Sequence, residues 1–211
     1  DGTFTYAAAD AAYLLNKASR GFNHLIYVLG QDHHSYPKRL NGIKEALGLD
    51  SISLTCILYQ LVSVREGTEQ LKLSKRAGRI IGLKDIIETV GSDVARFFYL
   101  NRKADAHLDF DLELALKKTD DNPVYYLQYA YVRTRSILEK ASTQKEFQDL
   151  QAEDLQYFGP AEQLLIKKIA SFKLLLCNIK KNYQVHLVAY YTIELAQMFH
   201  NYYHHHKIIV P

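Results

Sequence analysis

Three cations stand close together in the segment LKLSKRAG at residues 71–78, where Lys72, Lys75 and Arg76 fall within five residues. An apolar run, CILYQLVSV, precedes the segment, and Gly78 ends it. Repulsion between like charges is costly unless an anion or the solvent offsets it. The pattern leaves two interpretations open, a phosphate-binding loop or a solvated surface loop.

A second candidate site is GQDHH, residues 30–34, directly after the apolar run HLIYVL. Ligands of α/β sheets bind at the carboxyl ends of strands. Gly30 would let a backbone approach a ligand, and Asp32 could cap the next helix. Adjacent histidines rarely point at one ion, and no further His/Asp cluster follows at ligand spacing, so we expect no metal site.

Another acidic pair occurs in DFD, residues 109–111, which could hold a magnesium ion. The alternative, which we favour, is that Asp111 caps a helix in LELALKK.

The hydrophobic pattern changes along the chain. Strand and helix signals alternate over the first 90 residues, which predicts an α/β domain with parallel strands buried on both faces. Long helical patterns follow, so we place domains at 1–118 and 119–211, the second an all-α bundle. Strands are expected at 3–6, 24–30, 54–64 and 71–74, and helices at 7–19, 35–48, 83–91, 92–103, 111–119, 123–141, 160–180 and 186–206.

Composition narrows the class of protein. An apolar content of 48% supports a filled core. Cys56 and Cys177 both lie in apolar runs, which is typical of buried thiols in a reducing compartment. No apolar run reaches the roughly 20 residues of a membrane helix. We therefore expect a cytoplasmic protein with no membrane partner. Because the chain starts at Asp1 without a Met, we interpret it as a fragment of something longer.

The segment LLIKKIASFKLLLCNIKK, residues 164–181, carries five lysines and no acid. A nucleic-acid backbone could use such a basic stripe. A solvated lysine face on an amphipathic helix explains it equally well.

Taken together, the motifs resemble one family. KLSKRAG is similar to the KMSKS loop of class I aminoacyl-tRNA synthetases, with Leu73 in place of Met. The ordered segments DGTFTYAAADAAY, LIYVLGQDHH, TVGSDVARFFYL, HLDFDLELA and DNPVYYLQYAYVR resemble the arginyl-tRNA synthetase family over nearly the whole chain. The resemblance implies the second half of a Rossmann-like catalytic domain followed by an anticodon-binding domain truncated at its C-terminus.

The resemblance also implies a nucleotide site. Lys72, Ser74 and Lys75 match the loop that closes over ATP and stabilises charge on the pyrophosphate. Gly30 and His33 fall where the family binds the adenosine. Magnesium is expected to come with the ATP.

For the amino acid, Tyr6 and Asp10 match the family's arginine contacts, and Gln31 matches a further pocket position. Four residues apart on a helix, Tyr6 and Asp10 share one face. A carboxylate suits a guanidinium because two parallel hydrogen bonds can form. Without the resemblance, Asp10 would be taken as a solvated helix position.

For the tRNA, the residues that match anticodon-loop contacts are Tyr126, Tyr129 and Arg133. Offsets of three and four place them on one helix face, where tyrosines could stack on bases. The chain has 16 tyrosines, so a tyrosine-rich bundle core is the alternative.

The implied activity is that of an arginine–tRNA ligase, acting as a monomer on arginine, ATP and the tRNA for arginine. The family's HIGH-type motif is expected upstream of Asp1, so this chain alone should be inactive. One alternative is a non-catalytic tRNA-binding fragment or split-gene module. Another class I enzyme, such as the cysteinyl one, would need more zinc-binding cysteines than Cys56 and Cys177 provide.

Overall fold

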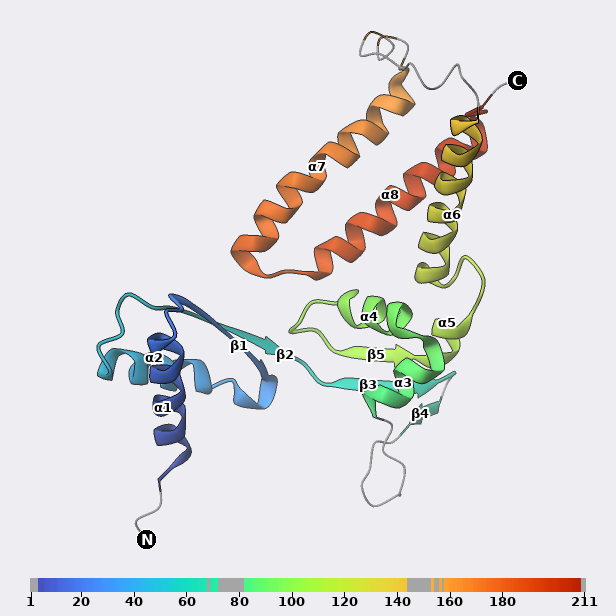
Figure 1. Cartoon of the computed structure of the whole chain (residues 1–211). Coiled ribbons are helices and arrows are strands. Elements are labelled where there is room, and N and C mark those ends of the chain that lie inside the picture. The colour runs from blue at the N-terminus through green and yellow to red at the C-terminus, as the bar shows by residue number, and fades with distance from the viewer. Residues whose placement is uncertain are drawn as a thin grey trace. The chain divides into compact units, whose positions relative to one another are not determined.

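The computed structural model describes residues 4–67, 69–71, 82–143, 153, 156 and 158–209 (Figure 1). The chain forms two compact units. The first comprises Asp1–Val62 with Ala104–Leu108, and the second comprises Ser63–Lys103 with Asp109–Pro211. No helix among the described residues is both long and apolar enough to cross a membrane.

The first unit is a small α/β layer. Its elements are α1 (Tyr6–Ser19), β1 (His24–Gly30), the 3₁₀ turn η1 (Gln31–His33), α2 (Tyr36–Ala46) and β2 (Ser53–Tyr59). β1 and β2 pair in parallel, from His24 opposite Ser53 to Gly30 opposite Tyr59, as the sequence predicts. The predicted strand at 3–6 is wrong for the described residues 4–6, because α1 already begins at Tyr6.

Within the first unit, the described residues cover one face of the β1–β2 pair. Leu25 of β1 packs with Leu14 of α1 and Ile52 in a buried cluster. Ile26 and Val28 point to the other face, because successive side chains of a strand alternate between its two faces. Val28 is 62% exposed there. The prediction that these strands are buried on both faces is therefore wrong for the described part of the chain.

The second unit contains a three-stranded sheet in the order β4-β3-β5. β3 (Val62–Glu66) and β4 (Glu69–Leu71) form an antiparallel hairpin, and Gly67 supplies the positive φ of +60° that its turn needs. The predicted strand 54–64 is in fact two, β2 and β3. They separate at Gln60, whose N–H donates to Ala104 O and whose side chain accepts from the N–H of Leu61.

The third strand, β5 (Leu108–Asp111), was not expected from the sequence. Its alternation is clear in the structure, since Leu108 and Phe110 are buried and Asp109 is exposed. Phe110 packs against Phe98 and Tyr99, with ring centroids 5.4 and 5.5 Å apart. Four residues are too few to separate a strand from a helix by period alone.

Short helices flank this sheet: α3 (Leu83–Val90), α4 (Ser92–Leu100) and α5 (Leu112–Leu116). Gly91, with φ +85°, joins α3 directly to α4. Asp111 caps α5 by accepting from the N–H of Leu114 at 3.0 Å, and it pairs with Arg65 at 2.7 Å. The helix-cap interpretation of Asp111 is confirmed.

The long helices α6 (Pro123–Ser142), α7 (Pro160–Asn182) and α8 (His186–His205) lie close to their predicted bounds. α8 packs against both α6 and α7 (Figure 1). The buried Asn122 starts α6: its side chain accepts from Val124 N and donates to the carbonyls of Ala115 and Lys117. The predicted fold class, an α/β segment followed by a helical bundle, is confirmed.

The compact units separate near residue 62, not at the predicted domain boundary of 118. The reason is that α4 packs against α6 and α8. The domain boundary at residue 118 therefore stays a prediction, and it differs from the boundary between the two compact units.

Candidate functional site

Lys72, Ser74 and Lys75 lie outside the described residues, between the end of β4 at Leu71 and the start of α3 at Leu83. Their roles in binding ATP stay predictions.

In the first unit, the predicted nucleotide residues follow β1. Gly30 is the last residue of that strand, and Gln31 and His33 form the 3₁₀ turn after it. A Cβ at position 30 would lie 2.6 Å from Asp32 Oδ1. The Asp32 carboxylate therefore lies against the backbone of Gly30, where a side chain would not fit without a shift. Asp32 does not cap α2: the N-cap residue is Ser35, and no side-chain capping hydrogen bond is present there.

Asp10 of α1 and His33 of η1 both contact Tyr36, the first residue of α2. Burial, together with a hydrogen bond to Asp10, raises the pKa of Tyr36 to about 12. The rings of His33 and Tyr36 meet edge to face, with centroids 6.0 Å apart. Tyr36 was missed by the sequence analysis, and it links a predicted arginine contact to a predicted adenosine contact.

The other two arginine candidates are less engaged. Tyr6 is 88% exposed one turn before Asp10, and Gln31 is exposed beside His33. The structure therefore gathers Asp10, Tyr36 and His33, whereas Tyr6 and Gln31 remain open to solvent.

A buried phenol belongs to the same region. The hydroxyl of Tyr27 on β1 is buried and has no hydrogen-bond partner among the described residues. Tyr27 also contributes to the raised pKa of Tyr36 through a charge interaction, which is smaller than the effects of burial and Asp10. Lys17 covers the Tyr27 ring, with Nζ 3.9 Å from the centroid.

In the second unit, the three predicted anticodon residues are together on α6 and are joined to α8. Arg133 donates from Nη2 to the hydroxyl of Tyr129 at 3.0 Å. Its guanidinium lies over the rings of Tyr129 and Tyr203, at 4.2 and 4.6 Å from their centroids. His200 of α8 lies within hydrogen-bonding distance of Arg133 and of the carbonyl of Tyr126. We call these five residues the α6–α8 aromatic cluster.

The two tyrosines of α6 play different parts. Tyr126 packs on His200 with centroids 4.5 Å apart, and burial, with a smaller effect of Asp120, raises its pKa. Tyr129 is 41% exposed. Tyr126 therefore belongs partly to the bundle packing, whereas Tyr129 and part of Arg133 face the solvent.

The lysine stripe of α7 is not uniform. Lys167, Lys173, Lys180 and Lys181 are exposed. The side chain of Lys168 is only 20% exposed; it pairs with Glu194 of α8 and covers the ring of Tyr191 at 4.8 Å. Lys168 therefore packs between α7 and α8, although the sequence pattern placed it with the surface lysines of this stripe.

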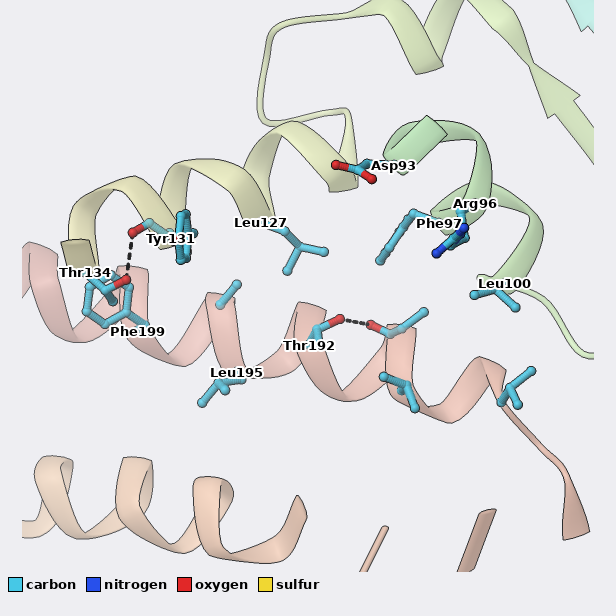
Figure 2. A pocket seen from close by; sticks show the side chains of 15 residues that line it. Asp93, Arg96, Phe97, Leu100, Leu127, Tyr131, Thr134, Thr192, Leu195 and Phe199 are labelled. Carbon is cyan, nitrogen blue, oxygen red and sulfur yellow. Dashed lines mark hydrogen bonds between the residues drawn. The ribbon is translucent and has the colours of Figure 1, made fainter. Parts of the chain in front are cut away.

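A pocket of about 600 Å³ opens between α4, α6 and α8 (Figure 2). α6 contributes Leu127, Ala130, Tyr131 and Thr134, spaced to form one helix face. Thr134 and Thr192 turn their hydroxyls back to the carbonyls of Tyr131 and Ala189. Of the described residues that line the pocket, only Asp93 and Arg96 are charged. The lining is thus largely apolar and offers few groups for acid–base chemistry.

The cysteines and acidic residues were also candidates for metal binding. No group of three or more His, Cys, Asp or Glu side chains suited to a metal occurs in the described ranges. Cys56 is partly buried and burial raises its pKa, but Cys177 is exposed. The prediction that both thiols are buried is wrong for Cys177, which lies at an exposed position of α7.

Residues 127–211, which include most of α6 and all of α7 and α8, match the model of the DALR anticodon binding domain. The bundle that carries the α6–α8 aromatic cluster therefore has the architecture of anticodon-binding domains.

Relatives match over nearly the whole chain. An arginine–tRNA ligase of Acinetobacter baylyi is 40% identical over 99% of this chain, and one of Elusimicrobium minutum is 45% identical over 96%. A crystal structure from Campylobacter jejuni, described as an arginyl-tRNA synthetase, is 34% identical and covers 100% of this chain with a TM-score of 0.88. Nearly the whole chain is therefore similar to arginyl-tRNA synthetases. It spans 36% and 38% of the length of the two ligases and 46% of the crystallised chain.

Proposed function

We propose that the chain is part of an arginine–tRNA ligase. In this reaction the carboxylate of arginine attacks the α-phosphorus of ATP and releases pyrophosphate. A hydroxyl of the terminal ribose of the tRNA then attacks the arginyl-adenylate and releases AMP. The observation that carries the proposal is the 40% identity to an arginine–tRNA ligase along 99% of the chain.

The nucleotide would be held by two segments. Lys72, Ser74 and Lys75 would contact the phosphates, where preorganised cations stabilise charge that develops on the leaving pyrophosphate. Gly30 and His33, at the carboxyl end of β1, would contact the adenosine. Magnesium would come bound to the ATP phosphates, which supply the oxygen ligands it prefers.

Arginine would be recognised by Asp10, with Tyr6 and Gln31 completing the pocket. A guanidinium has five N–H donors in a planar fork, so a carboxylate held in one orientation can accept two of them. Tyr36, whose pKa is raised by burial first and by the nearby Asp10 second, is a neighbour of this carboxylate.

The tRNA for arginine would be the macromolecular partner, with its anticodon loop on Tyr126, Tyr129 and Arg133. The exposure of Tyr129 and the match to an anticodon-binding domain support this. We further propose that the protein acts as a monomer in the cytoplasm, where tRNA is charged.

The alternative is a tRNA-binding module without catalysis. It is favoured by one observation, that the matched family model is confined to residues 127–211. The two proposals differ in whether arginine and ATP are turned over.

The test uses the full-length protein with arginine, ATP and the tRNA for arginine. We expect arginyl-tRNA to form, and Lys75→Ala to lower the rate roughly 10²-fold, as for loss of one preorganised donor. Lys84→Ala is the matched control, because Lys84 is an exposed lysine close by in sequence that pairs with Glu88 at 3.7 Å. Tight tRNA binding without arginyl transfer would support the module instead, and a normal rate in Lys75→Ala would remove that lysine from the site.

A further inference from the structure

His200 lies at the centre of the α6–α8 aromatic cluster. Its Nδ1 is 3.0 Å from Arg133 Nη1, and its Nε2 is 3.2 Å from the carbonyl oxygen of Tyr126. The ring also lies against Tyr126 and Tyr129, with centroids 4.5 and 5.7 Å away. One side chain of α8 therefore contacts all three predicted anticodon residues of α6.

The two hydrogen bonds fix the tautomer of His200. A guanidinium can only donate, so Nδ1 must accept from Arg133. A carbonyl can only accept, so Nε2 must carry the proton that it donates to Tyr126. The neutral imidazole thus fits both neighbours at once.

Arg133 is held on several sides. His200 takes one N–H and the hydroxyl of Tyr129 takes another, while the rings of Tyr129 and Tyr203 lie against the guanidinium plane. Of its five N–H donors, two are used in these bonds, so donors remain for an anion or a base edge. An arginine fixed in this way loses less side-chain entropy when a ligand binds.

We propose that His200 is a positioning residue that orients Arg133 for single-stranded RNA at this face. The proposal rests on the proposed function, in which this face binds the anticodon loop. His200 itself does not contact the RNA; it acts through the guanidinium, for which it supplies the acceptor. This role differs from simple packing between α6 and α8, which would need the ring but not its Nδ1 acceptor.

Three substitutions separate the two roles. His200→Asn keeps an oxygen close to the position of Nδ1, while His200→Gln moves its polar group toward the position of Nε2. His200→Phe keeps the ring and removes both hydrogen bonds. If His200 positions Arg133, affinity should follow the order Asn above Gln and Phe; if it only packs, Phe should be the best of the three.

The experiment titrates the tRNA for arginine, and a transcript with a changed anticodon, against the full-length protein. We expect His200→Phe to weaken binding of the cognate tRNA about tenfold, as for a lost hydrogen bond to a charged group, and His200→Asn to recover most of it. In an Arg133→Ala background, His200→Phe should have little further effect, since the two act as one unit.

Each result decides. If Arg133→Ala leaves binding unchanged, the proposed role of this face in tRNA binding fails. If Arg133→Ala weakens binding but His200→Phe does not, the face stands and the positioning role of His200 is wrong. Losses that add fully in the double variant would also contradict positioning. Should His200→Phe fail to fold, the comparison of Asn with Gln still decides, and equal losses in both would overturn the proposal.

Discussion

At the scale of single residues, the first unit places Tyr36 close to Asp10, the carboxylate that we propose binds the arginine. Asp10 alone on a helix would be free to rotate. Tyr36 lies close to it, and burial first, with the nearby Asp10 second, raises the pKa of Tyr36 to about 12. The phenol therefore stays protonated near neutral pH and remains a donor to the carboxylate.

We predict that Asp10→Asn in the full-length protein raises the KM for arginine, and not that for ATP, by roughly 10- to 100-fold, as for loss of a charge-assisted hydrogen bond. Tyr36→Phe removes only the donor to Asp10 and should raise the same constant by a smaller factor. Tyr13→Phe is the control on α1, since the Tyr13 ring contacts Lys17. Steady-state kinetics in both substrates would check this, and equal effects on arginine and ATP would mean that Asp10 supports the fold.

At the scale of elements, α7 and α8 are joined near one end by a hydrogen bond. The hydroxyl of Tyr202 donates to Glu162 Oε1 at 2.6 Å. This bond lowers the pKa of Glu162, and together with burial it raises the pKa of Tyr202 to about 12. The bond needs an ionised Glu162 and a protonated Tyr202.

The sign of the pH dependence follows. The lowered pKa of Glu162 stabilises the folded state above the ordinary glutamate pKa, and this stabilisation is lost as pH falls through the folded-state pKa. The raised pKa of Tyr202 stabilises the folded state at pH values below about 10. This stabilisation is lost as the pH rises from about 10 to about 12. We predict that Tyr202→Phe flattens both limbs of the unfolding free energy against pH, relative to the unsubstituted protein. Parallel curves for the two proteins would show that the bond does not contribute.

The lysines of α7 give a second test at this scale. Lys168→Ala should lower the unfolding free energy by about 1 kcal/mol, because it removes an ion pair and a cation–π contact with α8. Lys173→Ala, at an exposed position of the same helix, should leave stability unchanged. If Lys173 contacts a phosphate of the tRNA, Lys173→Ala should reduce the slope of log binding affinity against log salt concentration by about one unit. Denaturant unfolding and binding at two salt concentrations would separate them, and equal destabilisation would contradict the distinction.

The helices that were predicted well from the sequence have start or end residues that can be recognised from the sequence nearby. Asn122 and Pro123 start α6, and Gly91 ends α3. The failures are non-local: β5 is recognised only when Phe110 packs on α4, and the break between β2 and β3 depends on the carbonyl of Ala104. His200 was missed for the same reason, because its partner Arg133 is 67 positions away in the sequence.

At the scale of the whole molecule, both units leave apolar side chains in solvent. Val28 on the open face of β1 and Leu61 are 62% and 74% exposed, and Leu174 on α7 is also 74% exposed. The curated relatives are also much longer than this chain, which spans 36% of the first.

The last prediction concerns the chain Asp1–Pro211 by itself. We expect it to bind the tRNA for arginine through the second unit, where the α6–α8 aromatic cluster is complete in one compact body. We expect no arginine-dependent exchange of pyrophosphate into ATP, because loop cations cannot orient the phosphates without the remainder of a nucleotide site. The measurement pairs the exchange assay with a tRNA titration, using Lys75→Ala as the control for exchange and Arg133→Ala as the control for binding. Exchange above the Lys75→Ala background would show that the chain holds a complete catalytic site, and binding that Arg133→Ala does not weaken would show that the tRNA contacts lie elsewhere.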